Sequence, residues 1–204
     1  MSALPKKLLT ESEYLAIERG AEFKSEYVNG EMFPLHEPGP RGMAGARYAH
    51  NRIKENLVLA IGGRLLDGPC QTLSSDMKVK VPPSGPYYYP DVLIVCDEPE
   101  FLDSDSTDVL LNPAVVFEVL SDSTEGYDRG FKFRQYQKIP TLKELVLVAQ
   151  DEMVCERFVR QVDDTWLLTT FDKPNGEFSL STLSVRVPMA EIYRGVVLPA
   201  SPSR

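Results

Sequence analysis

The chain has 204 residues, of which 43% are hydrophobic and 25% are charged, and this composition is typical of a globular domain. Its apolar runs are all shorter than the roughly 18 residues of a membrane-spanning helix, and no apolar segment follows Lys6-Lys7, so we expect a cytoplasmic protein without a membrane span or a secretory leader. A net charge of −8 argues against bulk attraction to nucleic acid, although a local basic patch or a bound cation can reverse the field at one site.

The sequence first predicts a short helix and a hairpin, over residues 8–34. Thr10-Glu11-Ser12-Glu13 has the pattern of a capping box, which marks the start of a helix. Within Glu26–Met32, Asn29-Gly30 separates two short extended runs and predicts a type I′ turn. Prolines and glycines at positions 34–42 then indicate a loop.

A longer helix is predicted from about residue 46 to residue 61, because five apolar residues recur there at helical spacing: Ala49, Ile53, Leu57, Ala60 and Ile61. Gly62-Gly63 predicts the end of this helix. Residues 77–81 alternate apolar side chains with Lys78 and Lys80, which predicts a strand with one exposed face.

Two further apolar runs each carry an acid and predict strands that are buried on both faces. Asp91 precedes Val92–Cys96, and Glu118 lies within Ala114–Leu120. A buried carboxylate needs a partner, and Mg²⁺ takes oxygen ligands from one or two carboxylates. Acids at the ends of neighbouring strands therefore predict a metal-dependent active site. The acidic segment at residues 97–108 is interpreted as a solvated connection.

The remaining chain predicts a helix from about Glu125 to Lys138, a strand at residues 144–149, and a β-rich extension at residues 151–195 that ends in a short helix. Residues 199–204 are expected to form a frayed tail. This order predicts an α/β (α+β) fold, in which a mixed sheet is flanked by helices, within one domain whose core spans about residues 44–150.

The predicted helix after Glu118 carries Asp128, Lys132 and Tyr136 at positions i, i+4 and i+8, so these side chains share one face. Two interpretations stay open at this point. Asp128 and Lys132 form an ordinary i,i+4 ion pair, or the helix brings Lys132 towards the predicted acidic site.

The cysteines and histidines favour neither a disulfide framework nor a zinc site. The three cysteines are far apart and lack CxxC spacing, and we expect Cys96 and Cys155 to be small core residues. With His36 and His50 as the two histidines, a hydrolase that holds its metal through histidines is disfavoured.

Three segments together resemble the putative restriction endonuclease family of bacteria, a branch of the PD-(D/E)XK nuclease superfamily: Tyr89–Val92, Phe117–Thr124 and Asp128–Tyr136. The resemblance covers roughly residues 8 to 195, because further segments fit in the same order: Lys24–Glu31, Ala49-His50, Ser75–Val79 and Leu145–Val148.

This resemblance implies a restriction-endonuclease-like core, with Asp91, Glu118 and the backbone carbonyl of Val119 as ligands of Mg²⁺, for which Mn²⁺ is a possible substitute. In that superfamily a lysine normally follows the acid by two positions, where this chain has Leu120. Lys132 looks like the migrated replacement. The reaction implied is hydrolysis of phosphodiester bonds in DNA, which requires an activated water and stabilised phosphate charge.

Five more residues are candidates for supporting or substrate-binding roles, most with a plainer alternative. Glu26 is either a site carboxylate or an exposed charge, and Asp76 is equally a turn residue. His50 either contacts substrate or has a capping or surface role. Ser121 either touches phosphate or, with Ser123, caps the following helix. Tyr136 shares the face of Lys132.

The leading hypothesis is a Mg²⁺-dependent DNA endonuclease with general rather than sequence-specific cleavage. An alternative is a nuclease-like fold retained as a nucleic-acid or protein interaction module, which the acidic charge and Leu120 favour. A third is a glycoside hydrolase with Asp91 and Glu118 as its acid/base pair. Exposed edges of the C-terminal strands favour a homodimer.

Overall fold

The structure, a computed structural model, describes residues 8–35 and 48–199. Several predicted features lie outside these residues: the Lys6-Lys7 pair, most of the loop at residues 34–42 with His36, the first residues of the second helix, and the tail from residue 200.

The N-terminal helix and hairpin form as predicted. In α1 (Glu11–Arg19), the Thr10 side chain accepts a hydrogen bond from the Glu13 N–H, and the Glu13 side chain accepts one from the Thr10 N–H, which completes the capping box. The strands β1 (Ser25–Val28) and β2 (Glu31–Pro34) pair antiparallel across Asn29 and Gly30. The φ angles of these two residues are 51° and 86°, as a type I′ turn requires.

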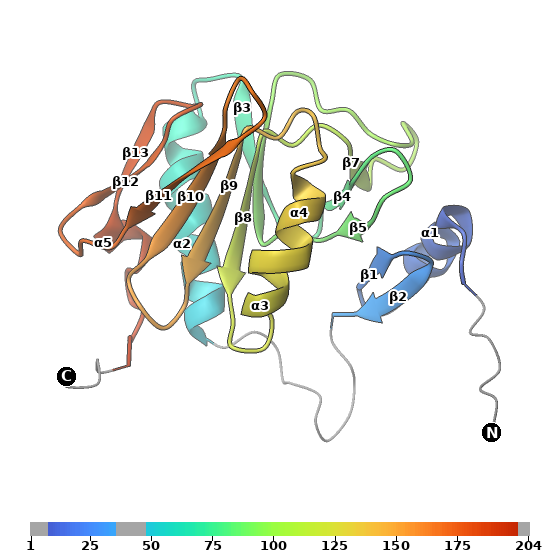
Figure 1. Cartoon of the computed structure of the whole chain (residues 1–204), viewed down its shortest axis with the longest axis horizontal. Helices are drawn as coiled ribbons and strands as arrows, with labels where there is room; N and C mark the ends of the chain where they lie inside the picture. The colour runs from blue at the N-terminus through green and yellow to red at the C-terminus, as the bar shows by residue number, and fades with distance from the viewer. Residues whose placement is uncertain (1–7, 36–47, 200–204) are drawn as a thin grey trace.

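A six-stranded mixed sheet forms the centre of the molecule, in the strand order β11-β10-β9-β8-β6-β3 (Figure 1). The pair of β8 (Val115–Leu120) with β9 (Glu144–Ala149) is parallel, and the other pairs are antiparallel. The remaining strands are β3 (Cys70–Ser74), β6 (Val92–Cys96), β10 (Cys155–Arg160) and β11 (Trp166–Phe171). The predicted α/β fold with a mixed sheet is confirmed.

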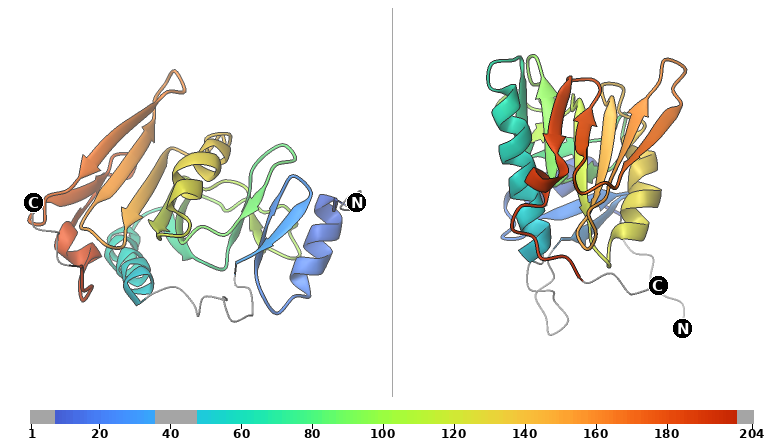
Figure 2. Two further views of the ribbon diagram at one scale, coloured as in Figure 1. Left: turned by 60° about the horizontal axis from the view of Figure 1, so that its bottom comes forward. Right: turned by 90° about the vertical axis from the view of Figure 1, so that its left-hand side faces the viewer.

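Helices cover both faces of this sheet (Figure 2, right). One face packs on α2 (Tyr48–Leu65), and the other on a continuous helical segment made of α3 (Glu125–Tyr127), a π-helical turn (Asp128–Lys132) and α4 (Phe133–Tyr136). Side chains of β8 alternate between these faces, because Phe117 and Val119 join the α2 core whereas Val116 and Leu120 join the α4 core.

A second sheet, in the order β2-β1-β5-β4-β7, joins the N-terminal hairpin to β4 (Lys78–Lys80), β5 (Tyr87–Tyr88) and β7 (Val109–Leu110). The expectation of a single sheet is therefore incomplete, because β5 and β7 are two-residue strands without a readable period.

Lys78 of β4 was predicted to lie on an exposed face, and this is wrong. The side chain is buried, and its ammonium pairs at 3.0 Å with Asp108 of the acidic segment, which also binds Arg19. The segment at residues 97–108 is therefore not merely a solvated connection, since it supplies the counter-charge of a buried lysine.

The helix α2 continues to Leu65, beyond the end predicted at Gly62-Gly63. Gly62 lies against β3, and a Cβ atom there would approach Thr72 Oγ1 to 2.9 Å. The glycine therefore permits close packing of helix on strand and does not terminate the helix.

The C-terminal extension is divided between two places. Strands β10 and β11 widen the central sheet, whereas β12 (Glu177–Leu180) and β13 (Val185–Pro188) form a separate hairpin followed by α5 (Met189–Ile192). This hairpin packs on the α2 face through Phe178, whose ring contacts the rings of Phe117 and Phe171.

Cys70 and Cys96 form a disulfide, which overturns the expectation that the chain lacks one and that Cys96 is an isolated core residue. The two residues are direct partners in the antiparallel register of β3 and β6. Sequence spacing could not show this register. Cys155 is a free, buried thiol, and its burial raises its pKa to about 12.

Among the helices of the described residues, none combines the length and the apolar character that crossing a bilayer requires.

Candidate active site

Asp91 and Glu118 lie at the same end of the central sheet. Asp91 directly precedes β6, Glu118 lies near the C-terminus of β8, and the antiparallel register pairs Val92 with Phe117. Asp91 Oδ2 accepts a 2.8 Å hydrogen bond from the Val119 N–H, so the carboxylate is held against the β8 backbone. The two acids therefore come from neighbouring strands, as the sequence predicts.

His50 approaches the same carboxylate from the first turn of α2. Its Nε2 atom lies 2.9 Å from Asp91 Oδ1, and both side chains are mostly buried. Because α2 packs on the sheet through Ile53 and Leu57, the helix fixes where this imidazole lies. The surface role is therefore wrong, because the ring is mostly buried against Asp91, whereas contact with substrate stays a prediction.

Glu118 lies on the α4 face of β8, where one oxygen receives two hydrogen-bonding groups. Its Oε1 accepts a 2.7 Å bond from the Tyr136 hydroxyl and lies 2.9 Å from Lys132 Nζ. Burial raises the pKa of Glu118 to about 8; Lys132 opposes this rise, whereas Asp128 and Asp91 add to it. The carboxylate is thus in a place where additional positive charge is favourable.

Lys132 is 5% exposed and lies among three carboxylates. Besides Glu118, its ammonium is 3.1 Å from Glu26 and 3.8 Å from Asp128. Burial alone would lower the pKa of Lys132, but these neighbours, Glu118 foremost, raise it well above its usual value. The i,i+4 pair of Asp128 and Lys132 is therefore present, but it is buried and Lys132 also reaches Glu118, as the second interpretation predicts. The interpretation of Glu26 as an exposed charge is wrong, because this side chain is buried.

Leu120, at the position where the resemblance implies a lysine, is a buried member of the α4 core. The only lysine that the described contacts bring to Glu118 is Lys132 of the helical segment. Lys132 is the last residue of the π-helical turn, and such turns are frequent at functional sites.

Asp76 and Ser121 do not join this cluster. The Asp76 side chain is 85% exposed and pairs with Lys24, in keeping with a turn residue. The Ser121 hydroxyl bonds to those of Ser123 and Thr124. The prediction that Ser121 or Ser123 caps the helix is wrong: the N-cap is Thr124, which makes no side-chain cap bond, and the Ser121 carbonyl closes the turn instead.

Tyr127 belongs to the cluster but was not predicted. Its hydroxyl donates a 3.4 Å hydrogen bond to Glu26 Oε2. It precedes the Asp128 position by one residue, so helical periodicity placed it off the shared face, and the contact depends on how β1 of the second sheet meets the helix.

The residues present fit a Mg²⁺ ion. In the described part of the chain, no three His, Cys, Asp or Glu side chains are arranged as a complete metal site. Mg²⁺ does not need such a cage, because it is usually bound by one or two carboxylates, waters and substrate phosphates. Asp91 and Glu118 supply hard oxygen donors, and the electrostatic repulsion between them favours a cation.

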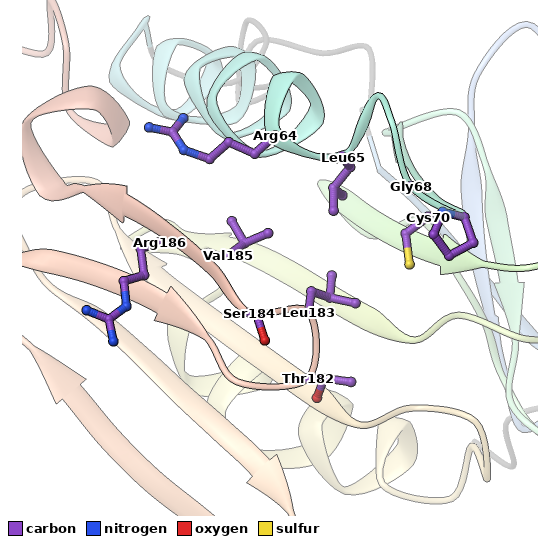
Figure 3. A pocket seen from close by; sticks show the side chains of 10 residues that line it. Arg64, Leu65, Gly68, Cys70, Thr182, Leu183, Ser184, Val185 and Arg186 are labelled. Atoms are coloured by element: carbon purple, nitrogen blue, oxygen red, sulfur yellow. The ribbon is translucent and has the colours of Figure 1, made fainter.

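A separate hollow of about 460 Å³ lies at the opposite end of α2 from His50 (Figure 3). Leu65 and Cys70 line it from one side, Leu183 lines it from the turn between β12 and β13, and Val185 from the start of β13. Arg64 at its rim is already bound by Glu191. None of the predicted site residues lines this hollow.

Comparisons with known proteins show the family and the fold of the chain. The sequence profile described as "Putative restriction endonuclease" matches residues 11–190. An uncharacterized protein of Synechocystis sp. (strain ATCC 27184 / PCC 6803 / Kazusa) is 36% identical over 179 residues, which are 88% of this chain and 96% of that protein. A second one from that organism is 31% identical over 188 residues, 92% and 93% of the two chains.

The fold also matches a solved structure, the crystal structure of a putative nuclease belonging to DUF820 from Anabaena variabilis ATCC 29413. The TM-score is 0.71 at 15% identity, and the match covers 93% of this chain and 99% of the other. At this low identity the likeness shows a shared fold.

Proposed function

Because the chain belongs to the Uma2 family, described as putative restriction endonucleases, we propose that it is a Mg²⁺-dependent DNA endonuclease with its active site at Asp91, Glu118 and Lys132. The observation that carries the proposal is the 2.9 Å contact between Lys132 Nζ and Glu118 Oε1. Lys132 of the helical segment thereby takes the place of the lysine that is missing at position 120 of β8.

The proposed ligands of Mg²⁺, or of Mn²⁺ in its place, are Asp91, Glu118 and the carbonyl of Val119. Bound there, the ion supplies an acidified water and a positive charge against the phosphate. His50 and the Val119 N–H hold the Asp91 carboxylate in one orientation, because each occupies one of its oxygens.

Lys132 stabilises the negative charge that develops on the phosphate in the transition state. Its ammonium is held by Glu26 as well as by Glu118, so its position does not depend on one partner. Tyr136 keeps Glu118 in place by donating to the same oxygen that the lysine approaches. Each of these side chains is buried and orders the site before substrate arrives.

The proposed substrate is DNA, cleaved without strict sequence preference, and the proposed assembly is a homodimer. The edge strand β11 supports the dimer, because it has no strand partner on its outer side among the described residues and carries no charged side chain. Two copies would place two active sites on one duplex.

Cleavage of supercoiled plasmid, linear duplex and single-stranded DNA with Mg²⁺ or Mn²⁺ tests the proposal. Wild type is expected to nick or cut in a metal-dependent manner, and Glu118→Gln and Asp91→Asn are expected to lose this activity. Asp76→Asn is the matched control, since its carboxylate lies outside the cluster, and it is expected to behave as wild type.

Folded wild-type protein that cleaves none of these substrates with either metal ion would contradict the proposal and favour an interaction module. Metal-dependent cleavage that persists in Glu118→Gln would contradict the assignment of the site.

A further inference from the structure

Two aromatic rings lie on the helical segment that supplies Lys132 to the candidate site. Tyr127 is 37% exposed, and its ring stacks on that of Phe131, with centroids 5.9 Å apart and an interplanar angle of 21°. Phe131 in turn packs on the core that contains Tyr136. Phe131 therefore connects the pair of rings to the core, and Tyr127 is the solvent-accessible ring of the pair.

Tyr127 is connected to the proposed catalytic lysine through a single side chain. Its hydroxyl donates to Glu26 Oε2 at 3.4 Å, and Glu26 Oε1 lies 3.1 Å from Lys132 Nζ. Burial raises the pKa of Tyr127 to about 12, and the charge of Glu26 adds to this, so the phenol stays protonated at neutral pH. The orientation of the ring is therefore fixed by the same carboxylate that holds the lysine.

A ring fixed in this way is suited to stacking against a nucleobase. Every base has a π face, so aromatic side chains bind single strands with little sequence preference. Bases inside a duplex are stacked on one another and present no face to a protein unless the duplex opens or a nucleotide is extruded. Arg134, one turn beyond Phe131, is exposed and forms no ion pair within the described ranges, so its charge is available to a phosphate backbone.

We propose that Tyr127, supported by Phe131, is a stacking platform for an unpaired nucleobase next to the phosphate bound at the active site. The inference rests on the proposed nuclease function and specifies its substrate class as single-stranded or locally melted DNA. The base that stacks belongs to the nucleotide beside the one whose phosphate meets Lys132.

Equilibrium binding without divalent metal ions separates this inference from cleavage. The probes are a short fluorescent single-stranded oligodeoxynucleotide and a blunt hairpin duplex of the same sequence, titrated with wild type, Tyr127→Ala and Tyr127→Phe. Wild type is expected to prefer the single strand. Tyr127→Ala is expected to lose about fivefold to a hundredfold in single-strand affinity, with little change for the duplex.

The controls address the hydroxyl and general surface effects. Tyr127→Phe keeps the ring and its stacking on Phe131 but loses the hydrogen bond to Glu26, so it is expected to bind the single strand more tightly than Tyr127→Ala and more weakly than wild type. Phe33→Ala removes an exposed aromatic ring of β2 and is expected to bind as wild type does. Thermal unfolding of each variant verifies that it is folded.

Equal losses on single strand and duplex in Tyr127→Ala, or unchanged binding by that variant, would overturn the platform. Wild type that cleaves duplex DNA but does not bind single strands would overturn it while leaving the proposed nuclease intact. If single-strand binding depends on Tyr127 but the protein cleaves no DNA with either metal ion, the proposed nuclease function is overturned and the stacking platform is retained.

Discussion

Lys132 faces three buried carboxylates, so the cluster carries more negative than positive groups. Burial raises the pKa of Glu118 to about 8, and the lysine is the group that most opposes this rise. At the scale of single residues, the ammonium therefore has two roles: it stabilises the folded cluster, and in the proposed reaction it stabilises phosphate charge. These two roles can be measured separately.

Lys132→Met is expected to lower the free energy of unfolding by about 3–5 kcal/mol, because it leaves buried carboxylates without their cation. Lys138→Met is the matched control, two residues beyond the end of α4. Lys138 is exposed and, among the described contacts, its ammonium bonds only to Gln135, so its loss is expected to change that free energy by less than about 0.5 kcal/mol. Denaturant unfolding of both variants measures the difference; equal effects would contradict the described burial of Lys132.

Asp108 gives a prediction about pH. Its hydrogen bond with Arg19 lowers its pKa to about 2, and Lys78 adds to this effect. Since the folded pKa lies below the usual value of about 3.8, ionised Asp108 stabilises the fold above about pH 4, and this contribution is lost as the pH falls towards 2. Asp108→Asn is expected to cost about 1–2 kcal/mol at pH 7.

Unfolding curves of wild type and Asp108→Asn between pH 2 and pH 7 test this, with the difference in stability expected to shrink at the acidic end. A difference that is constant with pH would show that the carboxylate charge is not its cause.

At the scale of elements, the sequence predicted the features that depend on contacts between residues close together in the chain. Thr10 with Glu13 and Asn29 with Gly30 act within four residues, so both features form as expected. The strands at residues 92–96 and 144–149 were readable because their apolar runs are continuous. Features set by tertiary contact were not readable: the cross-strand partner of Cys70, the burial of Lys78, and the meeting of Glu26 with Lys132.

Alanine substitutions at the two adjacent glycines of α2 distinguish the effect of helix propensity on stability from the effect of packing. Gly63→Ala is expected to raise the free energy of unfolding by about 0.5–1 kcal/mol, because a Cβ there meets nothing within 4 Å and alanine favours helix. The free energy of unfolding of Gly62→Ala is expected to be about 1–2 kcal/mol lower than that of Gly63→Ala, because the new Cβ crowds Thr72. Denaturant melts of the pair measure this; equal stabilisation would contradict the close packing of α2 on β3.

At the scale of the whole molecule, the candidate site is assembled where the two sheets meet. Glu26 comes from the second sheet, Asp91 from the connection between β5 and β6, and Glu118 from the central sheet. The sequence predicted Asp91 because it directly precedes an apolar run, and Glu118 because it lies within one. It left the role of Glu26 open, since a charge beside a hairpin gives no sign of what packs on it.

The open edge of the central sheet makes a prediction about assembly. Leu167 and Leu168 of β11 are 57% and 46% exposed. Antiparallel pairing of β11 with its copy would continue the sheet across a two-fold axis. Light scattering is expected to give the mass of a dimer for wild type and of a monomer for Leu168→Lys, with Leu59→Lys, on exposed α2 surface, as the dimeric control. A monomeric wild type would contradict the pairing.

Metal-dependent nicking of supercoiled plasmid by wild type and Lys132→Met, beside Lys138→Met, tests the central claim most directly. The account predicts that Lys132→Met loses about 10²–10³-fold in rate while it remains folded under the assay conditions, and that Lys138→Met nicks as wild type does. Undiminished nicking by folded Lys132→Met would contradict the claim that the helix supplies the lysine of the active site.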